Sequence, residues 1–294
     1  GNMRRVPGFK AWLFLCCLLI APLAALAEAG FSEGLLFRVQ GSDGTASYLF
    51  GTIHSEDPRV TKLPQQVRAA FDASATLALE VDMDPLSLLS AAGAMMLEEG
   101  QNLHSLVGDA TYERCRETAK RLGLPESVLN RYKPWAVAVL FSLPPVDSGQ
   151  FLDLLLYQAA SARAKTIVGL ETVDEQLGTF DGLSMTDQIA LLEDAIENIE
   201  QLPKLLEALI STYLRRDLRG LTELSLENFQ GDSEIMGRFQ EAAIFSRNRR
   251  MVDRLTPYIE RGGVFAAVGA LHLPGEQGML NLLQQRGYPV EKRY

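Results

Sequence analysis

Short apolar runs alternate along the chain with longer stretches in which apolar residues recur at helical spacing. Residues 35–39 and 46–50 are two short runs on either side of a Gly-Ser-Asp-Gly turn, a pattern that predicts a β-hairpin. Three later runs, at 77–81, 166–170 and 264–268, predict further strands. The predicted strands therefore lie mainly toward the two ends of the chain.

Helical spacing dominates the middle of the chain. The segments that show it are 65–74, 85–124, 150–164, 181–228, 239–255 and 277–285, and a last strand is predicted at 288–294. Pro203 divides the 181–228 stretch, because proline removes a backbone donor inside a helix. We expect one α/β domain over 28–294, with a central mixed sheet built from the N- and C-terminal halves and flanked by helices. A large helical insertion over about 85–250 is interrupted by the strand near 166–170.

The first 27 residues have the pattern of a signal peptide. Three basic residues precede an apolar run at 11–20, and Ala25-Leu26-Ala27 supplies a small-x-small cleavage pattern. We expect cleavage after Ala27 and an exported protein, periplasmic or secreted; a retained amphiphilic anchor is the alternative. After cleavage the apolar run is gone, so we expect no stable membrane insertion.

Loss of this leader changes both charge and cysteine content. It removes three of the 28 Lys and Arg residues and no acidic one, so 25 face 37 Asp and Glu and the net charge falls from −9 to −12. Such a surface repels nucleic acid and anionic lipid. Cys115 is then the only cysteine, which excludes an internal disulfide.

Two histidines occupy matching positions near the ends of predicted strands. Gly51 and Gly269 each follow an apolar run, and His54 and His272 come three residues after them. Glycine lets the chain turn away sharply, and ligands of open α/β sheets bind at the carboxyl ends of the strands. The third histidine, His104, has no partner motif, and we expect it to be structural or exposed.

Charged residues near other predicted strand ends complete the candidate site. Glu80 lies within the run 77–81, and Glu171 follows the run 166–170. Two imidazoles with carboxylates nearby suit a divalent transition metal, whose bound water a second carboxylate can deprotonate. The alternatives are histidines that only hydrogen-bond at strand ends and an outward-facing Glu80. For Arg247 and Asn248, a solvated helix face competes with a role at the site.

Seven sequence segments together resemble the TraB/GumN family, whose animal members are the Tiki proteases. The segments are YLFGTIH (48–54), Leu63-Pro64, ALEVD (78–82), YKPWA (132–136), GLETVDEQ (169–176), RNRRM (247–251) and VGALHLPGEQGMLNLLQQRGYPV (268–290). The resemblance implies an α/β core with paired Gly-x-x-His motifs and a protease that uses manganese or cobalt, with zinc as a third option. The family's motif residues correspond to His54 and His272, to Glu80 and Glu171, and to Arg247 and Asn248. We predict that His54, His272 and Glu80 hold the metal, from the strand-end position of Glu80, and that Glu80, Glu171, Arg247 and Asn248 serve catalysis. Which carboxylate is ligand and which is base stays open.

These observations lead to one main functional hypothesis and two alternatives. The main hypothesis is an exported metal-dependent hydrolase that cleaves a peptide or protein substrate and binds no nucleic acid. The alternatives are a haem- or metal-binding protein without turnover and a peptide-sequestering protein. The apolar faces of the helical insertion could form a lid or meet a second copy in a homodimer.

Overall fold

The computed structural model describes residues 31–227, 237 and 240–294. The predicted signal peptide, residues 1–27, lies outside them. Two predicted helices also include residues outside this range, at 228 and at 239. Among the described helices, none is long and apolar enough to cross a membrane.

The predicted hairpin is confirmed. Strands β1 (Leu36–Gln40) and β2 (Ala46–Thr52) pair antiparallel, with Leu36 opposite Phe50 and Gln40 opposite Ala46. Strand β6 (Val290–Lys292) adds to the other side of β1, also antiparallel.

Within the described residues, six strands form one mixed sheet in the order β4-β3-β5-β2-β1-β6, which confirms the predicted α/β class. Strands β2, β5 (Val264–Gly269), β3 (Thr76–Val81) and β4 (Thr166–Glu171) are parallel. Strand β5, from the C-terminal part of the chain, lies between two N-terminal strands, and all six of its residues are buried. Because the four strands are parallel, the residues that follow them meet at one edge of the sheet.

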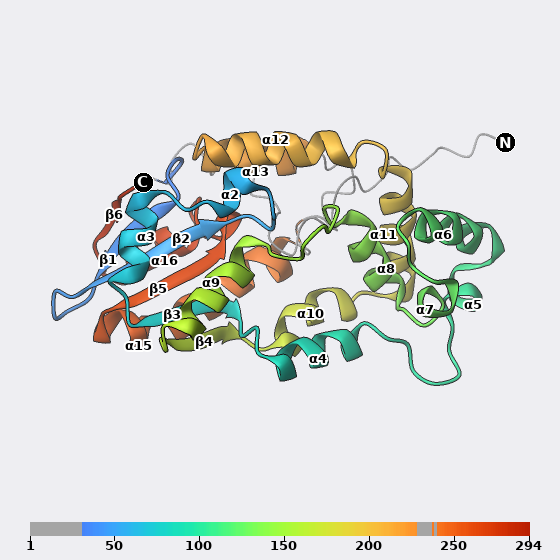
Figure 1. Ribbon diagram of the computed structural model, residues 1–294, viewed down its shortest axis with the longest axis horizontal. Coiled ribbons are helices and arrows are strands. Elements are labelled where there is room, and N and C mark those ends of the chain that lie inside the picture. Colours follow the sequence, from blue (N-terminus) through green and yellow to red (C-terminus); the bar gives the residue numbers. More distant parts are fainter. Residues whose placement is uncertain (1–30, 228–236, 238–239) are drawn as a thin grey trace.

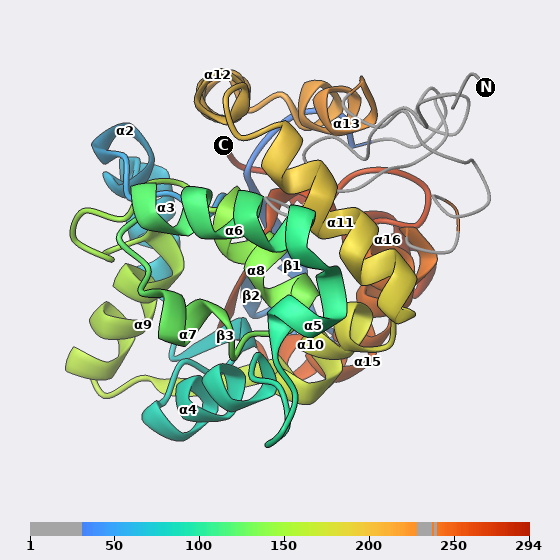
Figure 2. The same cartoon turned by 90° about the vertical axis from the view of Figure 1, so that its right-hand side faces the viewer.

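Helices cover the sheet and extend beyond it, as Figures 1 and 2 show. Those before β4 are α2 (Pro58–Thr61), α3 (Gln65–Asp72), α4 (Pro85–Ala94), α5 (Leu103–Val107), α6 (Asp109–Arg121), α7 (Glu126–Leu129), α8 (Pro134–Ser142) and α9 (Leu152–Ala162). Those after β4 are α10 (Val173–Asp181), α11 (Met185–Glu197), α12 (Leu202–Leu214), α13 (Leu218–Glu227), the π-helix η2 (Glu241–Phe245), α15 (Ser246–Arg261), the 3₁₀ turn η3 (Ala270–His272) and α16 (Met279–Gln285).

Helices α5 to α8 and α11 gather to one side of the sheet, on the right in Figure 1. Their centre is α8, in which eight of nine residues are buried, and α8 packs against α11. Trp135, in the first turn of α8, is fully buried and donates a hydrogen bond from its indole nitrogen to Asp181 at 3.0 Å. This group of helices therefore has its own apolar centre beside the sheet.

Two helix boundaries depart from the predicted pattern in an instructive way. Pro203 lies in the first turn of α12, where a missing backbone N–H costs nothing, so it begins a helix as well as dividing two. The helix predicted to end at residue 255 continues to Arg261 through Pro257. Leu255 and Ile259 are fully buried on its inner face, and this burial stabilises the helix beyond the proline.

Candidate active site

The two Gly-x-x-His segments lie side by side, because β2 and β5 are paired strands. Gly51 is opposite Val268, and Thr52 is opposite Gly269. A Cβ atom on Gly51 would come within 2.9 Å of Leu273 and 3.1 Å of the Ala270 backbone. Glycine at position 51 thus lets the turn that carries His272 pack directly onto β2.

His272 lies in the buried turn η3 and is fully shielded from solvent. Its Nδ1 is 2.6 Å from Oδ1 of Asn248, and the amide nitrogen of Asn248 donates to the carbonyl oxygen of Gln277 at 2.9 Å. Because the second bond orients the amide, Oδ1 accepts from Nδ1–H of the imidazole. In the neutral ring, Nε2 therefore carries the lone pair. Such outer hydrogen bonds are what hold metal-binding histidines in one tautomer.

Glu80 faces this lone pair from strand β3. One of its carboxylate oxygens, Oε1, lies 3.4 Å from Nε2 of His272 and accepts from Arg247 at 2.5 Å. The other, Oε2, accepts from the backbone N–H of Gly269 at 2.7 Å. Burial raises the pKa of this carboxyl, but the imidazolium form of His272, the charge of Arg247 and the Gly269 N–H outweigh burial and hold the pKa well below its usual range.

Arg247 joins the two carboxylates that the sequence singled out. Its Nε donates to Oε1 of Glu171 at 2.8 Å, while its Nη2 reaches Glu80. The side chain of Glu171 is fully buried, and its Oε2 accepts from Arg250 at 2.7 Å. Arg247 and Asn248 thus face the site, as the sequence suggested, because both lie on the inner side of α15.

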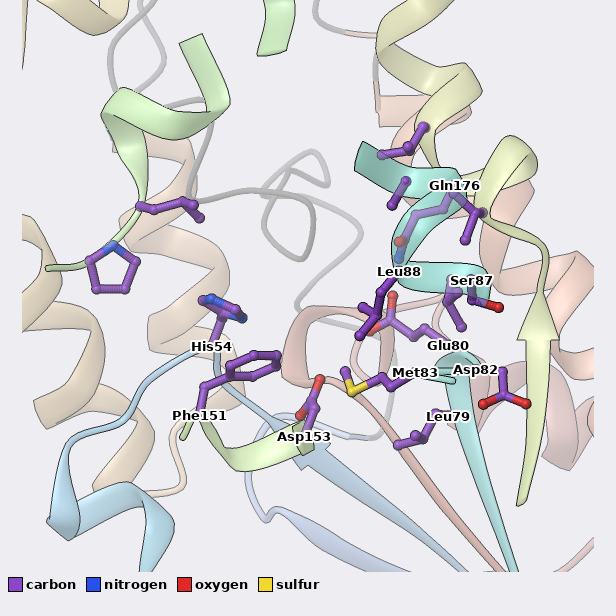
Figure 3. A pocket seen from close by; sticks show the side chains of 16 residues that line it. His54, Leu79, Glu80, Asp82, Met83, Ser87, Leu88, Phe151, Asp153 and Gln176 are labelled. Atoms are coloured by element: carbon purple, nitrogen blue, oxygen red, sulfur yellow. The ribbon is translucent and has the colours of Figure 1, made fainter. Parts of the chain in front are cut away.

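A cavity of about 260 Å³ opens beside Glu80, as Figure 3 shows. His54, Phe151 and Asp153 lie on one side of it, and Glu80 and Met83 lie on the other. Most of the remaining lining is apolar: Leu79, Val81, Leu88, Ala91, Leu143, Pro144, Val173 and Leu177. His272 and Glu171 are not among the lining residues. The cavity therefore combines a polar end with a largely apolar wall.

His54 lies in the wall of this cavity beside Phe151, and the two rings are tilted by 40° relative to each other. Its ring centroid lies 4.3 Å from that of Phe151. Burial lowers the pKa of His54, and the negative charge of Glu56 opposes the shift only in part. His54 is consequently a neutral imidazole near pH 7, the form that binds metals.

Asp153 is the site residue that the sequence analysis missed. It lies in the first turn of α9 and points into the cavity between His54 and Glu80 (Figure 3). Burial, and then the negative charge of Glu80, raise the pKa of Asp153 to about 7. A signal was present in the sequence, since Asp153 is the one charged residue in the apolar run 151–156. The helical pattern of that run hid it.

The third histidine, His104, lies in a different part of the fold and does not line the cavity. It sits in α5, stacks on Tyr112 with ring centroids 4.2 Å apart, and its Nε2 is 2.6 Å from Asp109. Nearly half of its side chain is exposed. It has the structural, partly exposed position expected of it.

The described residues contain no ready-made group of three or more His, Cys, Asp or Glu side chains that could hold a metal, but two buried atoms here are of the kind that a divalent metal accepts. Nε2 of His272 and Oδ1 of Asp153 are buried and make no hydrogen bond to any described residue. A nitrogen lone pair and a carboxylate oxygen 3.4 Å apart repel each other unless a proton or a cation lies between them. The ligand roles of His54, His272 and Glu80 stay predictions.

Comparison with known proteins gives the family. The family model described as TraB/PrgY/gumN matches residues 35–292. The chain is 27% identical to Metalloprotease TIKI2 of Danio rerio, 28% to Metalloprotease TIKI2 of Xenopus tropicalis and 27% to Metalloprotease TIKI1 of Homo sapiens. Each of these matches covers 83% of the chain and 58%, 57% and 59% of the respective relative. The chain thus spans under three fifths of these relatives.

No solved structure matches the chain significantly. The family match, by contrast, covers nearly all of the described residues and includes every candidate site residue named above. On this evidence the chain belongs to the TraB/PrgY/gumN family.

Proposed function

We propose that this protein is a metal-dependent hydrolase that cleaves peptide bonds in a peptide or protein substrate. The observation that carries the proposal is the pair formed by Nε2 of His272 and Oε1 of Glu80, 3.4 Å apart beside a cavity. Asn248 directs the lone pair of His272 toward that carboxylate. The names of the relatives, metalloproteases, support the same chemistry.

We assign the metal to His54, His272 and Glu80, with manganese or cobalt as the first candidates. Imidazole nitrogen and carboxylate oxygen together are donors that such ions accept. When bound, the ion would polarise a peptide carbonyl and make a nearby water more acidic. The apolar wall of the cavity would hold a substrate side chain next to these groups.

The remaining residues of the buried cluster position the ligands. Asn248 fixes the tautomer and the ring orientation of His272. Arg247 holds Glu80 by a charge-assisted hydrogen bond and is itself held by Glu171. Glu171 has both oxygens engaged by arginines and is buried away from the cavity, so it acts through Arg247 and not as a base.

Export through the leader at residues 1–27 is part of the proposal and rests on the sequence pattern alone. The haem alternative is less well supported by the geometry. The cavity of about 260 Å³ is smaller than the roughly 300–1,000 Å³ typical of small-molecule sites.

The proposal is tested by incubating the metal-stripped protein with a synthetic peptide library and reading the products by mass spectrometry. We expect cleavage only after Mn²⁺ or Co²⁺ is added and none with His272→Ala. His104→Ala is the matched control, because it removes a histidine at the surface, and it should retain activity. A wild-type protein that cleaves nothing with manganese, cobalt or zinc would overturn the proposal.

A further inference from the structure

The start of α9 is tied to the segment that carries His54. The backbone N–H of Leu152 donates to the carbonyl oxygen of Ser55 at 3.1 Å, and the Phe151 ring contacts the His54 ring with centroids 4.3 Å apart. Asp153 follows directly, in the first turn of the helix. Its position relative to His54 is therefore fixed by these two contacts between the start of α9 and the segment of His54.

One carboxylate oxygen of Asp153 is not engaged in a hydrogen bond with the described residues. Figure 3 shows its carboxylate pointing into the cavity, between His54 on one side and Glu80 on the other. Its Oδ1 is buried and makes no hydrogen bond to any described residue. A buried oxygen without a hydrogen bond is costly, so its place in a cavity indicates a partner that comes with the reaction.

Glu171 cannot fill this place, because Arg247 and Arg250 take up its two oxygens and it does not line the cavity. Glu80, in turn, is engaged by Arg247 and by Gly269 N–H. Of these three carboxylates, that of Asp153 points into the cavity (Figure 3) and has an oxygen that makes no hydrogen bond to any described residue. Asp153 therefore differs from Glu80 and Glu171, whose oxygens are engaged by arginines or by a backbone N–H.

We propose that Asp153 is the general base of the reaction. The proposal rests on the hydrolase function argued above. A water between Asp153 and the substrate carbonyl gives its proton to the Asp153 carboxylate, and its oxygen forms a bond to the carbonyl carbon, whose π electrons move to the carbonyl oxygen. When the tetrahedral species collapses, the C–N bond breaks and Asp153 returns the proton to the departing amine nitrogen. The proton is thus carried from water to amine, and no other reactant is needed.

The test compares Asp153→Asn with Asp109→Asn in three measurements on the purified protein. Asp109 also lies in the first turn of a helix, α6, but its side chain is almost fully exposed and does not line the cavity, so Asp109→Asn is a matched loss of charge. The measurements are peptide cleavage, Mn²⁺ affinity by calorimetry and the urea midpoint. For Asp153→Asn we expect a loss of kcat of about 10²- to 10⁴-fold. Mn²⁺ affinity should stay near wild type and the urea midpoint should not fall; Asp109→Asn should cleave normally.

Each other outcome has a defined meaning. If Asp153→Asn cleaves as fast as wild type, the base assignment is overturned and the hydrolase proposal stands. If Asp153→Asn loses Mn²⁺ binding or unfolds at lower urea, Asp153 is a ligand or a structural residue, and the assignment is likewise overturned. Asp153→Ala should show the same loss of kcat. This second variant shows that the loss comes from removing the carboxylate and not from the asparagine side chain introduced by Asp153→Asn. A wild type that never cleaves sinks the hydrolase function itself.

Discussion

The two Gly-x-x-His segments begin alike but have different surroundings. His54 lies on the open side of the site, in a cavity wall, and its contact is the ring of Phe151. His272 lies on the closed side, fully buried, with Asn248 on one nitrogen and Glu80 facing the other. Parallel pairing of β2 and β5 places the two segments side by side, but the residues around each strand end give the two histidines different environments.

The closed, buried side and the open, cavity side of the site differ in what their residues contact. The closed side holds charges in a fixed arrangement, and its residues support one another: Arg247 with Glu80 and Glu171, and Asn248 with His272. The open side places His54, Asp153 and an apolar wall around the cavity. Changes on the closed side should therefore cost stability or metal affinity. On the open side, loss of His54 should also cost metal affinity, whereas loss of Asp153 should cost turnover.

The largest effect should come from Arg247→Met. It leaves Glu80 and Glu171 buried without their shared cation, and breaking a buried ion pair costs about 3–5 kcal/mol. Urea unfolding should show this loss. Arg249→Met, two residues along the same helix, removes a half-exposed arginine paired with Glu241 and should leave the midpoint almost unchanged. Equal effects of the two changes would contradict a closed side held together by Arg247.

Asn248→Ala should weaken metal binding by about 10- to 100-fold, because His272 loses the partner that fixes its tautomer. Calorimetry with Mn²⁺ measures the effect. Asn281→Ala removes an exposed asparagine that caps a carbonyl of Glu276, and its Mn²⁺ affinity should match wild type. An Asn248→Ala protein with unchanged affinity would remove the argument that Asn248 prepares His272.

Gly51→Ala tests the packing between strand β2 and the turn that carries His272. The new methyl group would collide with Leu273 and with the backbone of Ala270, and overpacking of this kind costs about 1–3 kcal/mol. Gly93→Ala provides the opposite expectation. A Cβ there meets nothing within 4 Å, and alanine replaces glycine in a helix, so that variant should be slightly more stable. A Gly51→Ala protein as stable as wild type would mean that the motifs do not pack as described.

The smallest effect concerns acid stability at the outer end of the closed side. Hydrogen bonding to Arg254 lowers the pKa of Glu175 from 4.5 to about 2. This stabilisation is complete above about pH 4.5, where glutamate of the unfolded chain is also ionised, and is lost as the pH falls toward 2. Arg254→Met should therefore lose less stability than wild type between pH 5 and pH 3.

The expected difference for Arg254→Met is about 0.5–1 kcal/mol, because the pair is partly exposed. Arg261→Met removes the same charge from the last turn of α15, where the guanidinium lies over the Tyr258 ring. That variant should keep the wild-type pH dependence. Identical curves for all three proteins would show that the Glu175–Arg254 pair does not contribute to acid stability.

Much of the fold could be predicted because its strands carry local signals. The apolar runs at 35–39, 46–50 and 264–268 are short and bounded by turns, and they became β1, β2 and β5. The position of β5 between β3 and β2 was not readable locally, since strand order depends on contacts between distant segments. The extension of α15 through Pro257 likewise depends on burial of Ile259 by the rest of the fold.

For the candidate site, too, local sequence signals could be read and contacts between distant segments could not. His54, His272, Glu80 and Glu171 could be found because strand ends and glycines mark them in the sequence. Their arrangement could not be found, because it depends on which side of Arg247 each carboxylate lies. Asp153 was missed because its pattern is that of an ordinary helix, and only the packing of α9 against β3 and β4 brings it to the cavity.

The most direct test of the central claim is a crystal structure of the protein grown with Mn²⁺, with anomalous diffraction locating the ion. We expect one strong peak in contact with Nε2 of His272, a carboxylate oxygen of Glu80 and the imidazole of His54. Such a peak would show that the open and closed sides share one metal. Two results would contradict the account. One is the absence of a peak in crystals grown at a Mn²⁺ concentration that saturates the protein in solution, and the other is a peak away from His272 and Glu80.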